Sequence, residues 1–196
     1  NFYVDFRELL DKEKDLDAVT ISTPDHTHGI IGNNAMNRGL HVYIQKPLTH
    51  NIEEARILTN TAKKNKVVTQ MGNQGRSSDE IRSLKEWIDD DAIGKVREVF
   101  AWTDRPVGGH AWDTFAVKAM SNEKPPVPEG LDWNLWLGTS PERPYKKNFY
   151  HPGEWRKLID YGCGTFGDMG VHIFDTPYNA LALDVGLGLT SHWIAN

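Results

Sequence analysis

The sequence predicts an α/β protein whose first half is organised around a parallel β-sheet. Short runs of β-branched and apolar residues alternate there with segments that have helical periodicity. The links between runs and segments are short, and strand–helix units joined in this way favour a parallel sheet. Polar residues stand where the runs end, which is the edge at which such sheets bind ligands.

The first expected elements are a helix, a strand and a turn. Residues 6–10 have the apolar spacing of an amphipathic helix, and Asp5 is placed to cap it. Residues 18–23 are β-branched and apolar, as in a buried parallel strand. Residues 24–28 begin with proline, so we expect a turn that leads out of this strand.

Helix and strand signals continue to alternate after this turn. Residues 30–38 are expected to form a helix that ends at Gly39, because glycine suits the left-handed conformation that follows many helices. Residues 40–44 form the next expected strand. Asn51 can then cap a helix that extends to about Asn65, with acidic residues in its first turn.

The same pattern supplies one more strand and one more helix. Residues 67–71 form the strand, and Ser77 or Ser78 opens a helix that ends near Asp90. The residues that follow the expected strands are polar, and they include Thr23, Pro24, Gln45, Lys46, Asn73 and Gln74. The carboxyl ends of parallel strands meet at one edge, so we expect these residues to border a ligand site.

The character of the sequence changes near Gly94, and we place a domain boundary there. Residues 95–103 alternate in part between apolar and polar side chains, which predicts a longer strand. The following stretch is rich in proline and aromatic residues, which predicts irregular loops. We therefore expect a first domain over residues 1–94 and a second over residues 95–196.

Composition excludes several classes of protein. The 196 residues carry a formal net charge of −5, so a nucleic acid or an anionic membrane is not an expected partner. No run approaches the roughly 20 apolar residues that a membrane helix needs. The single cysteine, Cys163, excludes an internal disulfide framework and a cysteine-based zinc site, and we expect it to be a packed residue beside the glycines.

The strongest chemical signal is a glycine-rich segment that leads into Asp168 and His172, four residues apart. In a helix, side chains at this spacing project from one face. A carboxylate beside an imidazole orients the ring and stabilises its charged form, which makes an acid/base pair. Lys46, at the end of a distant apolar run, completes a candidate active site. The alternative is an ordinary helix start, with Asp168 as a cap and His172 half-buried.

Two other groups of residues have competing interpretations. His26 and His28, next to Asp25, are candidate metal ligands, although a role in a cofactor loop is favoured. Trp133 and Trp136 are expected in core or loop packing rather than in a sugar-binding platform.

Four motifs, taken in their order along the chain, resemble the Gfo/Idh/MocA family. They are Thr23-Pro24-Asp25-His26-Thr27-His28, Lys46-Pro47, Trp155-Arg156 and the segment from Gly162 to Asp175. The resemblance extends over nearly the whole chain. It implies an incomplete Rossmann domain that binds NAD or NADP, followed by part of an α/β domain with an open, mostly antiparallel sheet. It also implies a sugar or polyol substrate and a homo-oligomer, either a dimer or a tetramer.

The resemblance also implies roles for individual residues. Lys46 matches a lysine that contacts both cofactor and substrate, and Asp168 and His172 match the aspartate and the catalytic histidine of the family. No metal ligand is implied. The residues implied at the cofactor are Thr23, Pro24, His28, Gln45, Lys46, Asn73, Trp155 and Arg156.

These roles suit the oxidation of an alcohol. The carbon loses a hydride, which the cofactor accepts, and the oxygen loses a proton, which requires a base. His172 is the expected base, Asp168 the residue that orients it, and Lys46 the positive charge that stabilises the developing alkoxide.

The sequence departs from the family in two places. Gln45 stands where the family usually has glutamate. The Gly-x-Gly-x-x-Gly turn that holds a pyrophosphate is absent, and the pair Gly186 and Gly188 does not form it. We therefore expect the chain to lack the first two Rossmann strands, either as a piece of a longer protein, which we favour, or as a truncated gene product that cannot hold a pyrophosphate normally. The cytoplasm and the periplasm are both open as locations.

Three alternatives to an NAD(P)-dependent sugar or polyol dehydrogenase are open from the sequence. One is a glycoside-cleaving enzyme of the same fold, in which NAD transiently oxidises a sugar and so permits elimination. Another is a metal-dependent lyase, isomerase or hydrolase. The last is a sugar-binding protein without catalytic activity, an alternative that Gln45 and the missing turn keep open.

Overall fold

A parallel three-stranded sheet forms the first part of the chain in the computed structural model, which describes residues 1–103 and 121–183. The strands are β1 (Ala18–Ile21), β2 (His41–Gln45) and β3 (Thr69–Gly72), and they pair in that order. This confirms the predicted α/β fold class. Each strand lies within two residues of the expected bounds.

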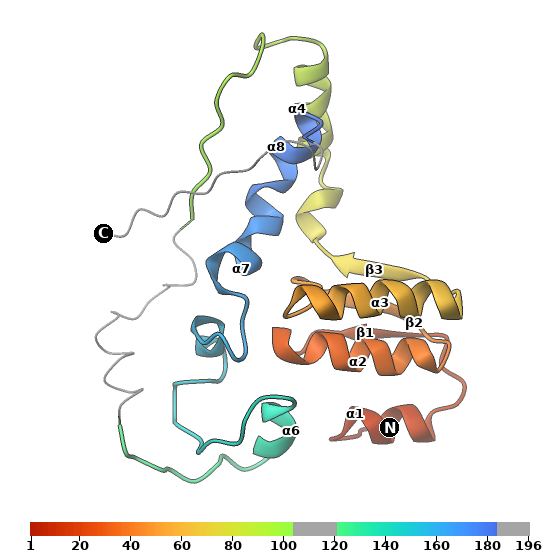
Figure 1. Ribbon diagram of the computed structural model, residues 1–196, viewed down its shortest axis with the longest axis vertical. Helices are drawn as coiled ribbons and strands as arrows, with labels where there is room; N and C mark the ends of the chain where they lie inside the picture. The colour runs from red at the N-terminus through yellow and green to blue at the C-terminus, as the bar shows by residue number, and fades with distance from the viewer. Residues whose placement is uncertain (104–120, 184–196) are drawn as a thin grey trace.

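The three strands end at the same level. Ile21 lies opposite Ile44, and Ile44 lies opposite Met71, so the carboxyl ends of the strands form one edge. Helices α2 (Asp25–Asn37) and α3 (Ile52–Asn65) connect successive strands and pack together on one side of the sheet (Figure 1).

Local capping explains where two of the helices begin. The side chain of Asp5 accepts a hydrogen bond from the main-chain N–H of Arg7, at the start of α1 (Phe6–Lys12). The side chain of Asn51 accepts one from the N–H of Glu54, at the start of α3. Both contacts satisfy main-chain donors that the first turn of a helix leaves unpaired, and both confirm predicted caps.

The apolar core of this part lies between the sheet and its helices. Its buried members come from the helices α1, α2 and α3 and from the strands β1 and β2; they are Leu10, Ile21, Ala35, Met36, Val42, Ile44 and Leu58. Burial of this set fixes the sheet against α2 and α3, because each aliphatic side chain contributes about 1.5 to 3 kcal/mol on leaving water.

The turn expected over residues 24–28 is wrong, because α2 already begins at Asp25. Pro24 occupies the N-cap position with φ −59°, close to the value that its ring imposes, and Asp25 supplies an acidic side chain to the first turn. His26 and His28 therefore stand on the first turn of a helix, where the fold holds their rings in fixed positions.

The chain then leaves the sheet through a short 3₁₀ turn, η1 (Gln74–Ser77), and the helix α4 (Asp79–Asp89). The described part of the second half contains α6 (Trp133–Leu137), the 3₁₀ turn η2 (Glu154–Lys157), α7 (Gly164–Ile173) and α8 (Asp175–Ala180). Figure 1 shows α7 beyond the carboxyl ends of the strands and α8 beside α4.

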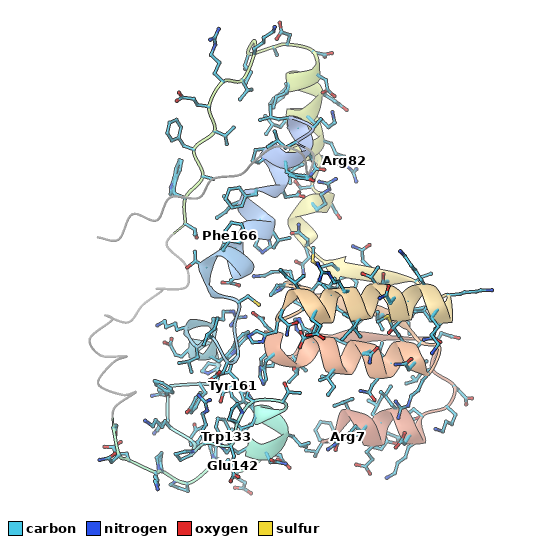
Figure 2. The ribbon with its side chains drawn as sticks, viewed as in Figure 1. Arg7, Arg82, Trp133, Glu142, Tyr161 and Phe166 are labelled. Atoms are coloured by element: carbon cyan, nitrogen blue, oxygen red, sulfur yellow. The ribbon has the colours of Figure 1, made fainter. Side chains whose placement is uncertain are left out.

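A second, aromatic cluster holds the segments before α7 together. Its buried residues are Leu137, Tyr145, Phe149, Tyr150, Trp155 and Tyr161. Trp133 stacks on Trp136 at 4.9 Å between ring centroids, which supports the packing interpretation of this pair. Figure 2 shows Trp133, on α6, and Tyr161, in the segment that leads to α7.

The strand predicted over residues 95–103 is not observed, because these residues have no regular secondary structure. No other described segment pairs with them, and an isolated strand is not stable without a partner. Val99, Phe100 and Trp102 are consequently exposed. In the described ranges no strand follows β3, so the expected antiparallel sheet has no counterpart there.

Residues 104–120 and 184–196, including Gly186 and Gly188, lie outside the described ranges. Within those ranges, every helix is too short or too polar to cross a membrane.

Candidate active site

Lys46 and Asp168 form the centre of the candidate site, although 122 positions separate them in the sequence. The Lys46 Nζ atom donates to Asp168 Oδ1 at 2.6 Å and to the main-chain oxygen of Asp168 at 2.9 Å. The side chains are 16% and 5% exposed. A buried ion pair of this kind is strongly destabilised when one partner is removed, because the other charge is then left without compensation.

The position of each partner follows from the local fold. Lys46 is the first residue after β2, at the carboxyl edge of the sheet. Asp168 lies on α7, which begins after a sharp bend: Gly164 has φ +64°, and a Cβ atom on Gly162 would lie 2.8 Å from the main chain of Arg156. Both glycines are therefore required by the path of the chain, and that path brings α7 to the sheet.

His172 lies one helical turn after Asp168 on α7 and is half-buried. Burial lowers the pKa of His172, and the positive charge of Lys46 lowers it further, against the opposing influence of Asp168 and Asp175. A histidine with a lowered pKa is neutral at pH 7 and has a lone pair to accept a proton. The structure thus brings together all three predicted catalytic residues.

The relation predicted between Asp168 and His172 needs correction. The Asp168 carboxylate accepts its hydrogen bond from Lys46, and its second oxygen, Oδ2, is buried without a partner. Asp168 therefore fixes the lysine, whereas its effect on the His172 imidazole is electrostatic. The helical spacing correctly predicted that Asp168 and His172 lie on one face of the helix. It could not show that Lys46, which is distant in sequence, donates the hydrogen bond to the Asp168 carboxylate.

Asp25 is a member of the site that the sequence analysis treated only as a neighbour of two histidines. It is 3% exposed at the start of α2. Burial raises the pKa of the Asp25 carboxyl, while His28, Arg156 and Cys163 act in the opposite direction. The burial of the thiol, followed by the charge of Asp25, raises the pKa of Cys163 to about 12, so this cysteine stays protonated and is not an activated nucleophile.

Arg156 borders the site from η2. Its Nε atom lies 3.9 Å from Asp168 Oδ1, and its guanidinium stacks over the ring of Trp155, 4.2 Å from the centroid. Trp155 itself is 4% exposed and donates through its indole N–H to the carbonyl of Pro152. Trp155 therefore supports the guanidinium from the aromatic cluster, and the guanidinium is the member of the pair that stays accessible.

The end of β3 contributes amide side chains. Asn73 donates through Nδ2 to the carbonyl of Val171 at 3.2 Å, which ties the sheet edge to α7. Gln45 accepts a hydrogen bond from Gln74 at 3.2 Å. The Arg76 guanidinium pairs with Asp175 at 2.9 Å and so adds a second link to the helices.

The predicted cofactor loop after β1 is only partly accessible. Thr23 is exposed and Pro24 is half-buried, whereas His28 is buried, with both ring nitrogens against main-chain oxygens. His26 is also buried, and its Nε2 atom lies 3.0 Å from the carbonyl of Trp136. Both rings thus have partners other than a metal. In the described ranges, no three His, Cys, Asp or Glu side chains are grouped in a way that could hold a metal ion.

The polar groups at this edge fit a polar ligand such as a dinucleotide. The buried oxygens Asn73 Oδ1 and Asp168 Oδ2 have no hydrogen-bond partner. An unpaired buried acceptor costs about 1 to 3 kcal/mol, which a donor on a ligand would offset. The Arg156 guanidinium adds further donors near Asp168, because its Nε atom lies 3.9 Å from Asp168 Oδ1.

Comparison of the sequence with models of known protein families identifies the family of this chain. A model described as an oxidoreductase family with an NAD-binding Rossmann fold matches residues 1–73. The model of the C-terminal α/β domain of the same oxidoreductase family matches residues 77–185. The chain belongs to the Gfo/Idh/MocA oxidoreductase family. This membership confirms the resemblance of the four motifs, and the family description agrees with the predicted class of cofactor.

Individual relatives match shorter stretches. Levoglucosan dehydrogenase of Pseudarthrobacter phenanthrenivorans is 29% identical over 92 residues, which cover 47% of this chain and 23% of that protein. The scyllo-inositol 2-dehydrogenase (NAD(+)) of Bacillus subtilis is 35% identical over 80 residues, 41% of this chain and 23% of that protein. The chain thus spans about a quarter of the length of these two relatives.

Among solved structures, the chain is similar to an inositol dehydrogenase homologue from Azotobacter vinelandii, crystallised with NADH and myo-inositol. The two are 32% identical, the match covers 48% of this chain and 26% of that one, and the TM-score is 0.46.

Proposed function

We propose that this chain is part of an NAD(P)-dependent oxidoreductase that removes a hydride from a CH–OH group of a sugar, cyclitol or related polyol. The observation that carries the proposal is the buried contact between Lys46 and Asp168, with a half-buried His172 one turn away. Family membership and relatives named as sugar and inositol dehydrogenases support the same class of reaction.

Each of the three residues has one task in this proposal. His172 takes the hydroxyl proton, because its lowered pKa leaves the ring neutral and able to accept. Lys46 stabilises the negative charge that develops on the substrate oxygen. Asp168 is the positioning residue, since its carboxylate Oδ1 and its main-chain oxygen accept hydrogen bonds from the lysine ammonium at 2.6 and 2.9 Å, respectively.

The nicotinamide cofactor, when bound, accepts the hydride. We propose that it lies along the carboxyl edge of the sheet, where Thr23, Pro24, Gln45 and Asn73 follow the strands and Arg156 faces them from η2. The first turn of α2, which carries His28, and Trp155, which supports the Arg156 guanidinium, would shape this surface from behind. Polar atoms without partners at the same edge support this placement.

Assembly as a homo-oligomer, either a dimer or a tetramer, is part of the proposal. The support is a set of large apolar side chains exposed on α4 and in the segment after it, namely Trp87, Ile93, Phe100 and Trp102. Light scattering on the full-length protein would test it, and a monomer at all concentrations would contradict it.

The direct test is reduction of NAD and of NADP by a panel of polyols that includes inositols and levoglucosan. With the full-length protein, replacement of His172 by alanine should lower turnover about 10² to 10⁴-fold, the usual effect of losing a general base. His41→Ala is the matched control, because His41 is exposed on β2, and it should leave turnover unchanged. Near-normal turnover of the His172→Ala protein would remove His172 from its role.

A further inference from the structure

The ring of His28 is held between two main-chain carbonyl groups from different loops. Its Nδ1 atom lies 2.7 Å from the oxygen of Pro47, and its Nε2 atom lies 2.6 Å from the oxygen of Thr23. The residue is 1% exposed, so water does not compete for either nitrogen. Both distances are short for N–H···O hydrogen bonds, as they are when the donor is charged.

The two carbonyl partners of His28 determine how many hydrogen atoms its ring nitrogens must carry. A carbonyl oxygen can only accept a hydrogen bond, so each ring nitrogen has to donate. Neutral imidazole has one N–H group and imidazolium has two. Both contacts are therefore satisfied together only when hydrogen is present on both nitrogens.

The charges around His28 are compatible with a cationic ring. Asp25 stands three residues earlier on α2 and is also buried. Burial raises the pKa of the Asp25 carboxyl, and His28 is the largest influence in the opposite direction. From α3, the carboxylate of Glu54 packs against Gly29, the residue after His28. The other titratable groups nearby are the cationic Arg156 on η2 and His26 on α2, and burial lowers the pKa of His26, which favours its neutral form.

The two carbonyl groups belong to loops that the proposed reaction needs. Thr23 lies two residues after β1, in the expected cofactor loop, and Pro47 directly follows Lys46 at the end of β2. We propose that His28 is a positioning residue whose doubly protonated ring ties the loop after β1 to the loop after β2 and so holds Lys46 against Asp168. The effect on turnover rests on the proposed function, whereas the state of the ring does not.

Nuclear magnetic resonance of the full-length protein with ¹⁵N-labelled histidine tests the state of the ring directly. From the two carbonyl contacts we expect both nitrogens of His28 to carry hydrogen in the folded protein at neutral pH, in slow exchange with water. A spectrum in which either His28 nitrogen lacks hydrogen would overturn the proposal. This measurement needs no substrate, so it stands apart from the proposed function.

Turnover tests the positioning role. Glutamine can reach one of the two carbonyl groups from position 28 but cannot bridge both. His28→Gln should therefore lower kcat by about 10- to 100-fold, the scale expected when a catalytic group is misplaced by about 1 Å. His41→Gln, on the exposed surface of β2, is the matched control and should keep wild-type kcat. Wild-type kcat in the His28→Gln protein would contradict the role, and the ring measurement decides the matter if that protein does not fold.

Discussion

Lys46 donates hydrogen bonds to both the carboxylate and the main-chain oxygen of Asp168, and these two bonds join the end of β2 to α7. One side chain thereby links the part of the chain that matches the Rossmann-fold family model to the segment that presents His172. The contact is both structural and chemical, because the atom that holds α7 in place is also the positive charge proposed to act on the substrate oxygen.

Removal of the Asp168 carboxylate should destabilise the protein strongly. Asp168→Ala leaves the Lys46 ammonium without its buried partner, which costs about 3 to 5 kcal/mol in the free energy of unfolding. Asp79→Ala is the matched control, because the Arg82–Asp79 pair lies on the surface of α4 with the Asp79 side chain 93% exposed. It should change the free energy of unfolding by less than about 0.5 kcal/mol. Urea denaturation measures both, and equal losses would show that the contact is not buried in solution.

The protonation of His172 should respond to its neighbours in opposite directions. The ammonium of Lys46 opposes a positive charge on the ring, so Lys46→Met should raise the pKa of His172. Asp175 favours the charged ring, so Asp175→Asn should lower the pKa of His172 further. Titration of the ring resonances by NMR measures both shifts. Shifts of the same sign in the two proteins would mean that the ring does not face both groups.

Two glycines before α7 should differ in how they tolerate a methyl group. A Cβ atom at Gly162 would meet the main chain of Arg156, which cannot move without disturbing η2, so Gly162→Ala should cost about 1 to 3 kcal/mol. Gly164 has open space around it, and Gly164→Ala should cost about 1 to 2 kcal/mol from its positive φ alone. Chemical denaturation together with turnover separates them, because only Gly162→Ala should also displace Arg156. Unchanged turnover in a folded Gly162→Ala protein would contradict that displacement.

The hydroxyl group of Tyr161 should be dispensable for stability. The residue is fully buried in the aromatic cluster, and its oxygen has no hydrogen-bond partner. Tyr161→Phe removes an unsatisfied polar atom and should leave the free energy of unfolding unchanged or increased. Tyr161→Ala removes the ring and should cost about 3 to 5 kcal/mol. Thermal or urea denaturation compares the two, and a large loss in Tyr161→Phe would reveal a partner for the hydroxyl.

Local sequence patterns predicted most of the helices and strands in the first half of the chain. Capping by Asp5 and Asn51, and the β-branched strands, depend on residues close in sequence, so their signals are readable. The start of α2 at Asp25 was missed because proline was taken as the sign of a turn, although proline also suits the residue before a helix. The strand over 95–103 failed because alternation alone does not supply a partner. The domain boundary near Gly94 stays a prediction.

The sequence predicted most of the residues of the candidate site, but it did not predict the contacts between them. The motifs predicted Lys46, Asp168 and His172 as site residues. No local pattern shows whether the buried carboxylate of Asp168 will accept a hydrogen bond from His172 or from Lys46. The bridging position of His28 depends on two carbonyl groups from separate loops. Every residue has a main-chain carbonyl group, so the sequence does not indicate which of them a side chain will contact. Asp25 gave no signal of its own, because the groups that act on its carboxyl include Arg156, Cys163 and Asp168, which lie far away in the sequence.

The measurement that tests the central claim most directly is the transfer of deuterium from a polyol labelled at its CH–OH carbons to the nicotinamide ring. The full-length protein is incubated with oxidised cofactor, and the mass of the reduced cofactor is then determined. Our account predicts the gain of one deuterium atom, at a rate that falls about 10² to 10⁴-fold in the His172→Ala protein. Binding of NAD(P) without deuterium transfer from any polyol, or transfer at the same rate in both proteins, would contradict it.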